Sequence, residues 1–251
     1  MRLIRAEALK LVRRRGLMTW SLLLTVGSVL VAQIIIVILH AVNPDKHGPA
    51  GGTTNLEHYI FLVTGLGSVA AIIVGSTAGT QDVSNGVFRD LVVTGRGRRT
   101  LFAVRIPGAL AVFLPMLALG FALAVGGAYL FAGNLPHPTG SLIAKYAEYA
   151  LAGSVIDIII AVGLAAFASS RVVVGVLIAW NAIVSQLLMQ IGSLGSIRKG
   201  IDSAAVLQFG PENLTRNATV HMSKGAALLV LVAWAAVFIT AGRWWTQRRD
   251  A

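Results

Sequence analysis

The chain has 251 residues, of which 56% are hydrophobic and only 12% are charged. Soluble domains carry about 25% charged residues, so this composition excludes an ordinary soluble domain and indicates a protein of the lipid bilayer. The net charge of +11 favours nucleic-acid binding only if the basic residues lie outside membrane-flanking loops. The chain has no cysteine, which excludes disulfides and cysteine metal sites.

The first residues form a basic amphipathic stretch. Ile4, Ala8 and Leu11 recur at helical spacing, whereas the basic residues lie largely on other faces. This pattern favours a helix over residues 1–18 that lies in the membrane interface, and the alternative is a frayed basic tail. The apolar run that follows is too long for the core of a signal peptide, so we interpret it as a retained first span.

Six apolar stretches are long enough, or nearly so, to cross the hydrocarbon layer, which takes about 20 residues of helix. They are residues 20–39, 59–78, 106–131, 149–167, 172–191 and 225–241. We therefore predict an all-α membrane protein, with a single transmembrane domain over residues 1–251. The longest polar connection is the outer segment 192–224, in which "SIRKGIDSAAVLQF" predicts a short helix on the outer face.

The distribution of lysine and arginine predicts the orientation of the six spans. If both termini are cytoplasmic, the cytoplasmic segments hold 15 basic residues in 60 positions and the outer segments hold 6 in 69. Basic loops stay in the cytoplasm, so we expect a multi-pass protein of the cell (plasma) membrane with cytoplasmic N- and C-termini. Its arginines then meet anionic lipid head groups, and no nucleic-acid partner is needed to explain the charge.

A strongly basic segment, residues 81–99, joins the second and third spans. We predict a helix over residues 81–93. Asp82 or Ser84 is expected to cap its start, and Gly95 and Gly97 are expected to end it because glycine adopts the left-handed turn at low cost. Such a surface helix either docks in a groove of a partner protein or touches only lipid.

With these segments the chain resembles the membrane-spanning subunits of ABC transporters of the ABC-2 export type. Three features carry the resemblance: a basic amphipathic helix before six spans with both ends inside, the pattern Asp82-x-x-x-Gly86 followed by an apolar run and a "TGRGRR" turn, and a larger outer segment between spans five and six. Two features depart from the family pattern: Val87 replaces the usual threonine, and residues 94–98 replace the usual proline turn.

The resemblance implies that the segment between spans two and three contains a cytoplasmic coupling helix, which docks on a separate ATPase subunit. The implied partners are two copies of that ATPase, which bind ATP and Mg in place of this chain, and a second permease copy or paralogue. The residues expected to contact the ATPase are Asp82, Gly86, Val87, Phe88, Arg89, Asp90 and Leu91. Phe88 and Leu91 are the expected apolar anchors. Arg89 and Asp90 are expected to fix the orientation by ion pairing.

Polar residues within the spans are candidates for a translocation path. Asp157 is the one ionisable residue well inside a predicted span, where a charge is costly unless it faces protein, water or another charge. It either lines a cavity that attracts a cationic or polar cargo or is protonated and bonded to a neighbour. In the resembling family, spans one, two and five border the path. The path candidates are Gln33, Asp157, Asn181, Ser185 and Gln186, and for each the alternative is a hydrogen bond between helices.

The sequence carries no recognisable catalytic motif. It has no phosphate-cradling loop and no H-E-x-x-H, its histidines are not paired at metal-ligand spacing, and its aspartates are scattered. We therefore expect no catalytic residue, metal or cofactor in this chain. The resemblance implies the permease subunit of an ATP-driven exporter for an amphipathic or hydrophobic cargo, such as an antibiotic, peptide, lipid or drug. The alternatives are a membrane-embedded lipid-modifying enzyme and a non-transporting anchor or sensor subunit.

Overall fold

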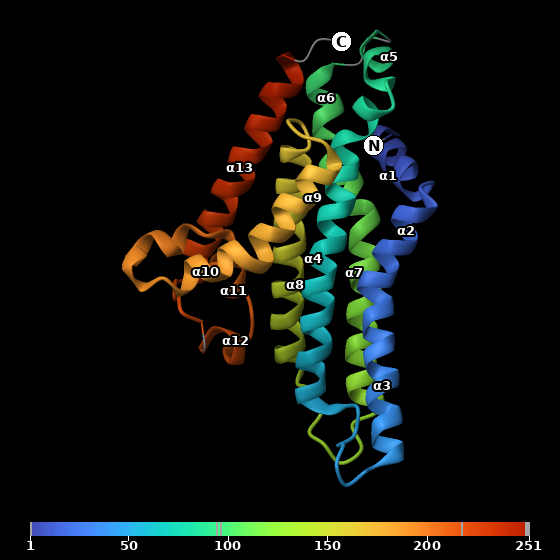
Figure 1. The fold of residues 1–251 in the computed structure, drawn as a ribbon, viewed down its shortest axis with the longest axis vertical. Helices are drawn as coiled ribbons and strands as arrows, with labels where there is room; N and C mark the ends of the chain where they lie inside the picture. Colours follow the sequence, from blue (N-terminus) through green and yellow to red (C-terminus); the bar gives the residue numbers. More distant parts are fainter. Residues whose placement is uncertain (1, 94, 96, 217, 249–251) are drawn as a thin grey trace.

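The computed structural model describes residues 2–93, 95, 97–216 and 218–248, and this part of the chain is built from helices joined by loops (Figure 1). Within it, six helical segments are long and apolar enough to cross a bilayer. They are Arg15–Val42, Gly52–Ser84, Arg98–Leu130, Gly140–Leu164, Ser170–Gln190 and Lys224–Arg248. The predicted all-α fold with six spans is therefore confirmed, and the chain is a multi-pass membrane protein.

The helices follow the chain in a simple order. The first half contains α1 (Arg2–Val12), α2 (Arg15–Leu22), the π-helical turn η1 (Leu23–Gly27), α3 (Ser28–Val42), α4 (Gly52–Ser84), α5 (Val87–Val93), α6 (Arg98–Ala103) and α7 (Arg105–Leu130). The second half contains α8 (Gly140–Leu164), α9 (Ser170–Ala179), the π-helical turn η2 (Trp180–Val184), α10 (Ser185–Gln190), the 3₁₀ segment η3 (Gly192–Gly200), α11 (Asp202–Leu207), α12 (Glu212–Arg216) and α13 (Lys224–Arg248). The first and fifth spans are therefore each interrupted by a π-helical turn.

Each span begins before the apolar stretch that predicts it. The clearest case is α4, which has 33 residues. At 1.5 Å per residue it is about 50 Å long, whereas the hydrocarbon layer is about 30 Å thick. Hydropathy locates the part of a helix that lies in lipid, but backbone hydrogen bonding continues into the polar flanks and sets where the helix ends.

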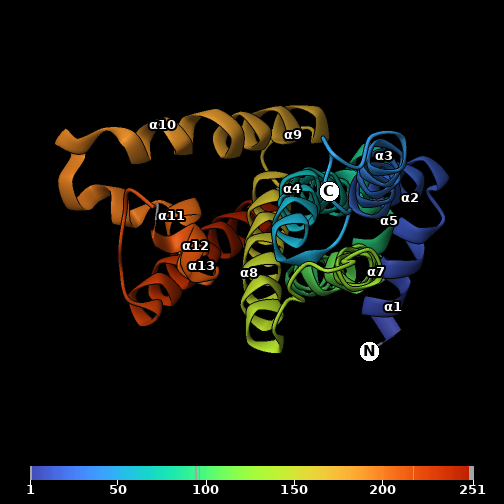
Figure 2. The same cartoon turned by 90° about the horizontal axis from the view of Figure 1, so that it is seen from below.

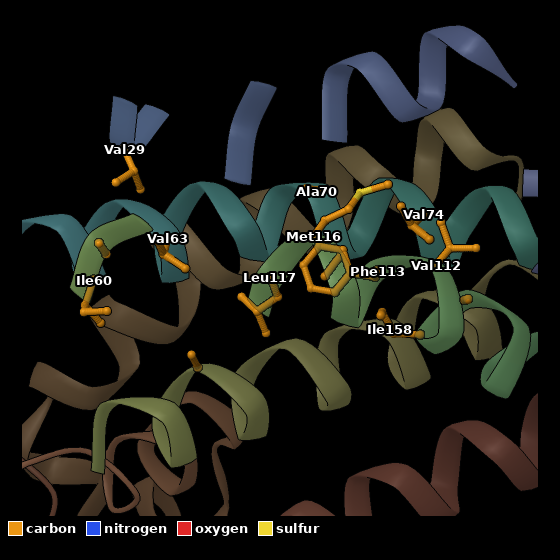
Figure 3. Close-up of a cluster of buried hydrophobic side chains, with 14 of the residues drawn as sticks. Val29, Ile60, Val63, Ala70, Val74, Val112, Phe113, Met116, Leu117 and Ile158 are labelled. Atoms are coloured by element: carbon orange, nitrogen blue, oxygen red, sulfur yellow. The ribbon is translucent and has the colours of Figure 1, made fainter. Parts of the chain in front are cut away.

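At the centre of the bundle lies α4, packed between α7 and α8 (Figures 1 and 2). Small residues allow the close approach to α8: a Cβ atom on Gly79 would lie 2.3 Å from the Cβ of Ala165. Figure 3 shows apolar side chains from all three helices, among them Val63, Phe113 and Ile158, in one buried cluster. Because lipid is as apolar as these side chains, their close packing is what holds the spans together.

The segment between the fifth and sixth spans folds against the side of the bundle. Figures 1 and 2 show α11 and α12 on the side of α8 that faces away from α7. Val206 of α11 belongs to a buried cluster with Ile156 of α8 and Leu231 of α13. The indole Nε1 of Trp234 donates a hydrogen bond to the carbonyl of Gly200 at 2.8 Å. The short helix predicted in this segment is therefore present as α11, and it forms one wall of the bundle.

The helix predicted over residues 81–93 is divided in two. Because α4 continues without a break to Ser84, Asp82 lies inside it and has no free helix start to cap. A turn at Gly86, with φ of +71°, then separates α4 from α5. The predicted start is therefore wrong, whereas the predicted end is correct, since α5 ends at Val93. Of the two glycines expected to end the helix, Gly95 has φ of +82° and Gly97 is extended, with φ of −62°.

Candidate functional site

A cavity of about 650 Å³ lies between α4, α8, the fifth span and α11. Sites for small organic molecules typically measure about 300–1,000 Å³. Along α4 the cavity extends from Phe61 to Ile72, which corresponds to about 16 Å of helix. Its wall is mostly apolar. Ser68 lies between Phe61 and Ile72 on α4, and Asp157 and Asn181 line the cavity from α8 and the fifth span.

Three polar side chains join three helices at the wall of this cavity. Ser68 Oγ donates a hydrogen bond to Asp157 Oδ2 at 2.6 Å, and Asn181 Nδ2 donates to Asp157 Oδ1 at 2.9 Å. Asn181 Nδ2 also donates to Ser68 Oγ at 3.2 Å, so the serine accepts from the amide while its own hydrogen points to the carboxyl group. Both oxygens of Asp157 therefore have a hydrogen-bond partner within the protein.

A second carboxylate, that of Asp202 at the start of α11, lines the same cavity. Asp202 is only 2% exposed, and its Oδ1 accepts a hydrogen bond from Trp180 Nε1 at 2.9 Å. Burial raises the pKa of Asp202, and the hydrogen bonds from Trp180 and from the backbone N–H of Ser203 partly oppose that rise. Ser203 Oγ also lies 3.2 Å from Ser185 Oγ, so two side-chain contacts tie α11 to the fifth span.

The π-helical turn η2 determines which residues of the fifth span face the cavity. The backbone N–H of Ser185 bonds to the carbonyl of Trp180, five residues earlier, so the helical repeat gains one residue here. Asn181 and Gln186 consequently both line the cavity, although they are five residues apart. Ser185, four residues after Asn181, is instead fully buried. Single π-helical turns occur frequently at functional sites because they turn side chains in this way.

Aromatic side chains occupy the part of the cavity nearest the start of α4. Phe61 lines the cavity and is nevertheless 74% exposed, so it stands at the edge. Tyr149 of α8 also lines the cavity, and its hydroxyl is hydrogen-bonded to the side chain of Thr64. The entrance is therefore formed by flat apolar surfaces, and the carboxylate of Asp157 lies two turns of α8 beyond Tyr149.

The structure brings three of the predicted path residues together at the cavity: Asp157, Asn181 and Gln186. Gln33 lies elsewhere. Its Nε2 donates a hydrogen bond at 2.8 Å to the carbonyl of Leu123, between the first and third spans. Gln33 thus makes the interhelical hydrogen bond that was its alternative interpretation.

Sequence reasoning misses Ser68, Tyr149 and Asp202 as cavity residues, and it misses Trp180 as the hydrogen-bond donor to Asp202. A serine or tyrosine within a span is too common to stand out. Asp202 carries a detectable signal, because the run Ala204–Val206 that follows it is more apolar than a solvated loop requires. All three residues of that run are buried.

A second charged cluster, the charged quartet of Glu7, Lys10, Asp82 and Arg105, joins α1, α4 and α7. Lys10 Nζ lies 2.6 Å from Glu7 Oε1 and 2.7 Å from Asp82 Oδ1. Arg105 Nη2 lies 3.5 Å from Asp82 Oδ2, and its Nη1 donates to the carbonyl of Gly79 at 2.9 Å. Burial raises the pKa of Glu7, against the hydrogen bond from Lys10. Asp82, a predicted ATPase contact, is only 3% exposed, and its carboxylate is held within the chain.

The other predicted contact residues lie on or next to α5. This helix lies at the tip of α4, at the end of the bundle where α13 ends (Figure 1). Gly86, Val87 and Asp90 are exposed. The side chains of Phe88, Arg89 and Leu91 lie outside the described part of the structure. The available surface of α5 therefore combines an apolar and an acidic side chain after a glycine turn.

Comparisons with known proteins add no relative. A scan against protein-family models and a search of curated proteins both find no match for this chain. The function must therefore be argued from the six spans, the cavity, the charged quartet and α5.

Proposed function

We propose that the chain is the permease subunit of an ATP-driven exporter, and that the cavity lies on the path of an amphipathic or hydrophobic cargo. The observation that carries this proposal is the position of α5: a short helix with exposed Val87 and Asp90, held at the tip of α4 between two glycines of positive φ. A helix in this place serves as a docking point for a separate ATPase of the ABC type, as the resemblance to ABC-2 permeases implies.

The geometry of α4 supports mechanical coupling between that docking point and the cavity. Ser68, whose hydroxyl bonds to Asp157, and Ser84, the last residue of α4, belong to one uninterrupted helix. They are 16 residues apart, which corresponds to about 24 Å. A force applied to α5 therefore moves α4 as a rigid element and changes the wall of the cavity at Ser68.

The charged quartet supports the same coupling. Asp82 lies two residues before the end of α4 and pairs with Lys10 of α1 and Arg105 of α7. A displacement of the tip of α4 is therefore transmitted to the start of the third span as well. In the proposed complex, two ATPase copies bind ATP and Mg, two permease copies face each other across the path, and α5 lies in the cytoplasm.

Two variants of α5 test the proposal. Phe88→Asp places a charge at the expected apolar anchor, and Val93→Asp also replaces an apolar residue by an acid, at the 78% exposed last position of α5. Each tagged chain is purified from its native membranes, its partners are identified, and ATP hydrolysis is measured after reconstitution in vesicles. We expect the unchanged chain and Val93→Asp to retain a partner that contains a phosphate-cradling loop, and Phe88→Asp to lose it while still inserting in the membrane.

Two results contradict the proposal. One is an unchanged chain that copurifies with no nucleotide-hydrolysing partner. The other is a Phe88→Asp chain that retains the partner at normal yield and with normal ATP hydrolysis.

A further inference from the structure

The cavity holds two carboxylates and no base. Asp157 and Asp202 both line it, and none of the described residues that line it is a lysine, arginine or histidine. Among the described residues, no salt bridge involves either acid. A buried carboxylate is costly unless a cation or a set of hydrogen bonds compensates it.

The hydrogen bonds that reach the two carboxylates all come from neutral donors. Asp157 receives the hydroxyl of Ser68 and the amide of Asn181, and Asp202 receives the indole of Trp180. These donors fix the positions of the oxygens and bring no positive charge with them. A positively charged group that enters the cavity therefore stabilises the ionised form of both acids.

The rest of the wall suits the body of an organic molecule. Phe61 and Tyr149 present aromatic rings, whose faces attract organic cations, and Val69, Ile72 and Val206 add aliphatic surface. A compact, strongly hydrated metal ion gains nothing from such a wall. An apolar cation loses little hydration on entry and buries its carbon surface against these side chains.

We propose that this cavity binds amphipathic organic cations, with the positive charge beside Asp157 and Asp202 and the apolar body against Phe61, Tyr149 and the aliphatic wall. This inference rests on the proposed function only in taking the bound cation as cargo. The binding itself is a property of this chain, without ATP and without a partner.

Tetraphenylphosphonium, a compact apolar cation, is a suitable probe. Its saturable binding to the full chain is measured in neutral detergent with radiolabelled probe, and tetraphenylborate, an anion of the same shape, is measured separately. We expect saturable binding of the cation and none of the anion. Asp157→Asn keeps the size of the side chain and removes its charge, and we expect it to raise the Kd at least tenfold. Asp202→Asn should raise it several-fold.

Matched controls separate charge from folding. Glu148→Gln removes a carboxylate of the same helix that is exposed and paired with Lys224, so the Kd should stay within twofold. Gly65→Leu fills the cavity, because a Cβ atom there meets nothing within 4 Å, and it should abolish binding in a folded chain. Gly126→Leu places the same side chain at an open position of α7 and should bind normally.

The inference is overturned if the unchanged chain shows no saturable binding of the cation, if Asp157→Asn and Gly65→Leu both bind it as tightly as the unchanged chain, or if the anion binds equally well. Should the chain bind the cation in this way but recruit no ATPase, the proposed function fails and the cation site stands. Should it recruit the ATPase and bind no cation, only the inference about the cavity falls.

Discussion

Removing the charge of the buried Asp82 should destabilise the chain more than removing the charge of its half-exposed partner Lys10. Its carboxylate bridges Lys10 and Arg105, and Arg105 is only 1% exposed. In Asp82→Asn the guanidinium stays buried and loses its ion pair with Asp82. Glu7 remains near enough to interact with Arg105 and compensates in part.

The expected loss follows from the burial of each partner. Breaking a buried ion pair from one side costs about 3–5 kcal/mol, and the remaining Glu7 places Asp82→Asn at about 3 kcal/mol. For a chain of this size, that corresponds to a decrease in Tm of roughly 6–12 °C. Lys10 has 32% of its side chain exposed, so Lys10→Met should cost only about 0–1 kcal/mol.

Thermal unfolding in detergent, followed by intrinsic fluorescence, measures these differences. The decisive comparison adds Arg105→Met and the double variant Asp82→Asn/Arg105→Met. Because the double variant leaves no unpaired buried charge, its Tm should lie above that of either single variant. The reasoning is refuted if Asp82→Asn lowers Tm no more than Lys10→Met does, or if the two single losses simply add.

Two further changes probe the packing around the same elements. Glu7→Gln should gain stability relative to the unchanged chain as the pH rises above 4.5. Burial raises the pKa of Glu7, so above this pH the folded state holds a proton that the unfolded state has released, and the unchanged chain loses stability. The Tm of both chains, measured at a series of pH values, checks this, and a difference in Tm that stays constant with pH contradicts it. Gly120→Ala should lower the free energy of unfolding by about 1–3 kcal/mol, since its Cβ would lie 2.5 Å from the carbonyl oxygen of Thr25. Gly126→Ala in the same helix meets open space and should leave the stability unchanged. Equal unfolding temperatures of the two variants would contradict the close packing at Gly120.

The six spans and Asp157 could be predicted because each depends on one stretch of sequence. A span is a run of apolar residues, and a carboxylate within such a run is conspicuous wherever the helix packs. Asp202 could not be recognised in this way, since it lies in a polar connection whose position beside α8 is set by long-range packing. The pairing of Asp82 with Arg105 likewise depends on how α4 meets α7, which spacing along the chain does not encode.

The fifth span shows the same limit within one helix. An ideal helical repeat places Asn181 and Ser185 on one face. In the structure the extra residue of η2 rotates the following turn, so that Gln186 joins Asn181 at the cavity and Ser185 faces away. A π-helical turn has no clear sequence signature. The polar residues of the fifth span could therefore be found from the sequence, but which of them line the cavity could not.

The two acidic sites of the chain differ in how their charge is compensated, and the difference separates a structural role from a binding role. In the charged quartet, two acids meet two bases of the same chain. At the cavity, Asp157 and Asp202 meet only neutral donors. Both sites contact α4, one at its tip and one at Ser68, halfway along it. A movement of α4 that leaves the quartet intact can therefore still alter the cavity, in which the described lining residues include no base to pair with the proposed cation site.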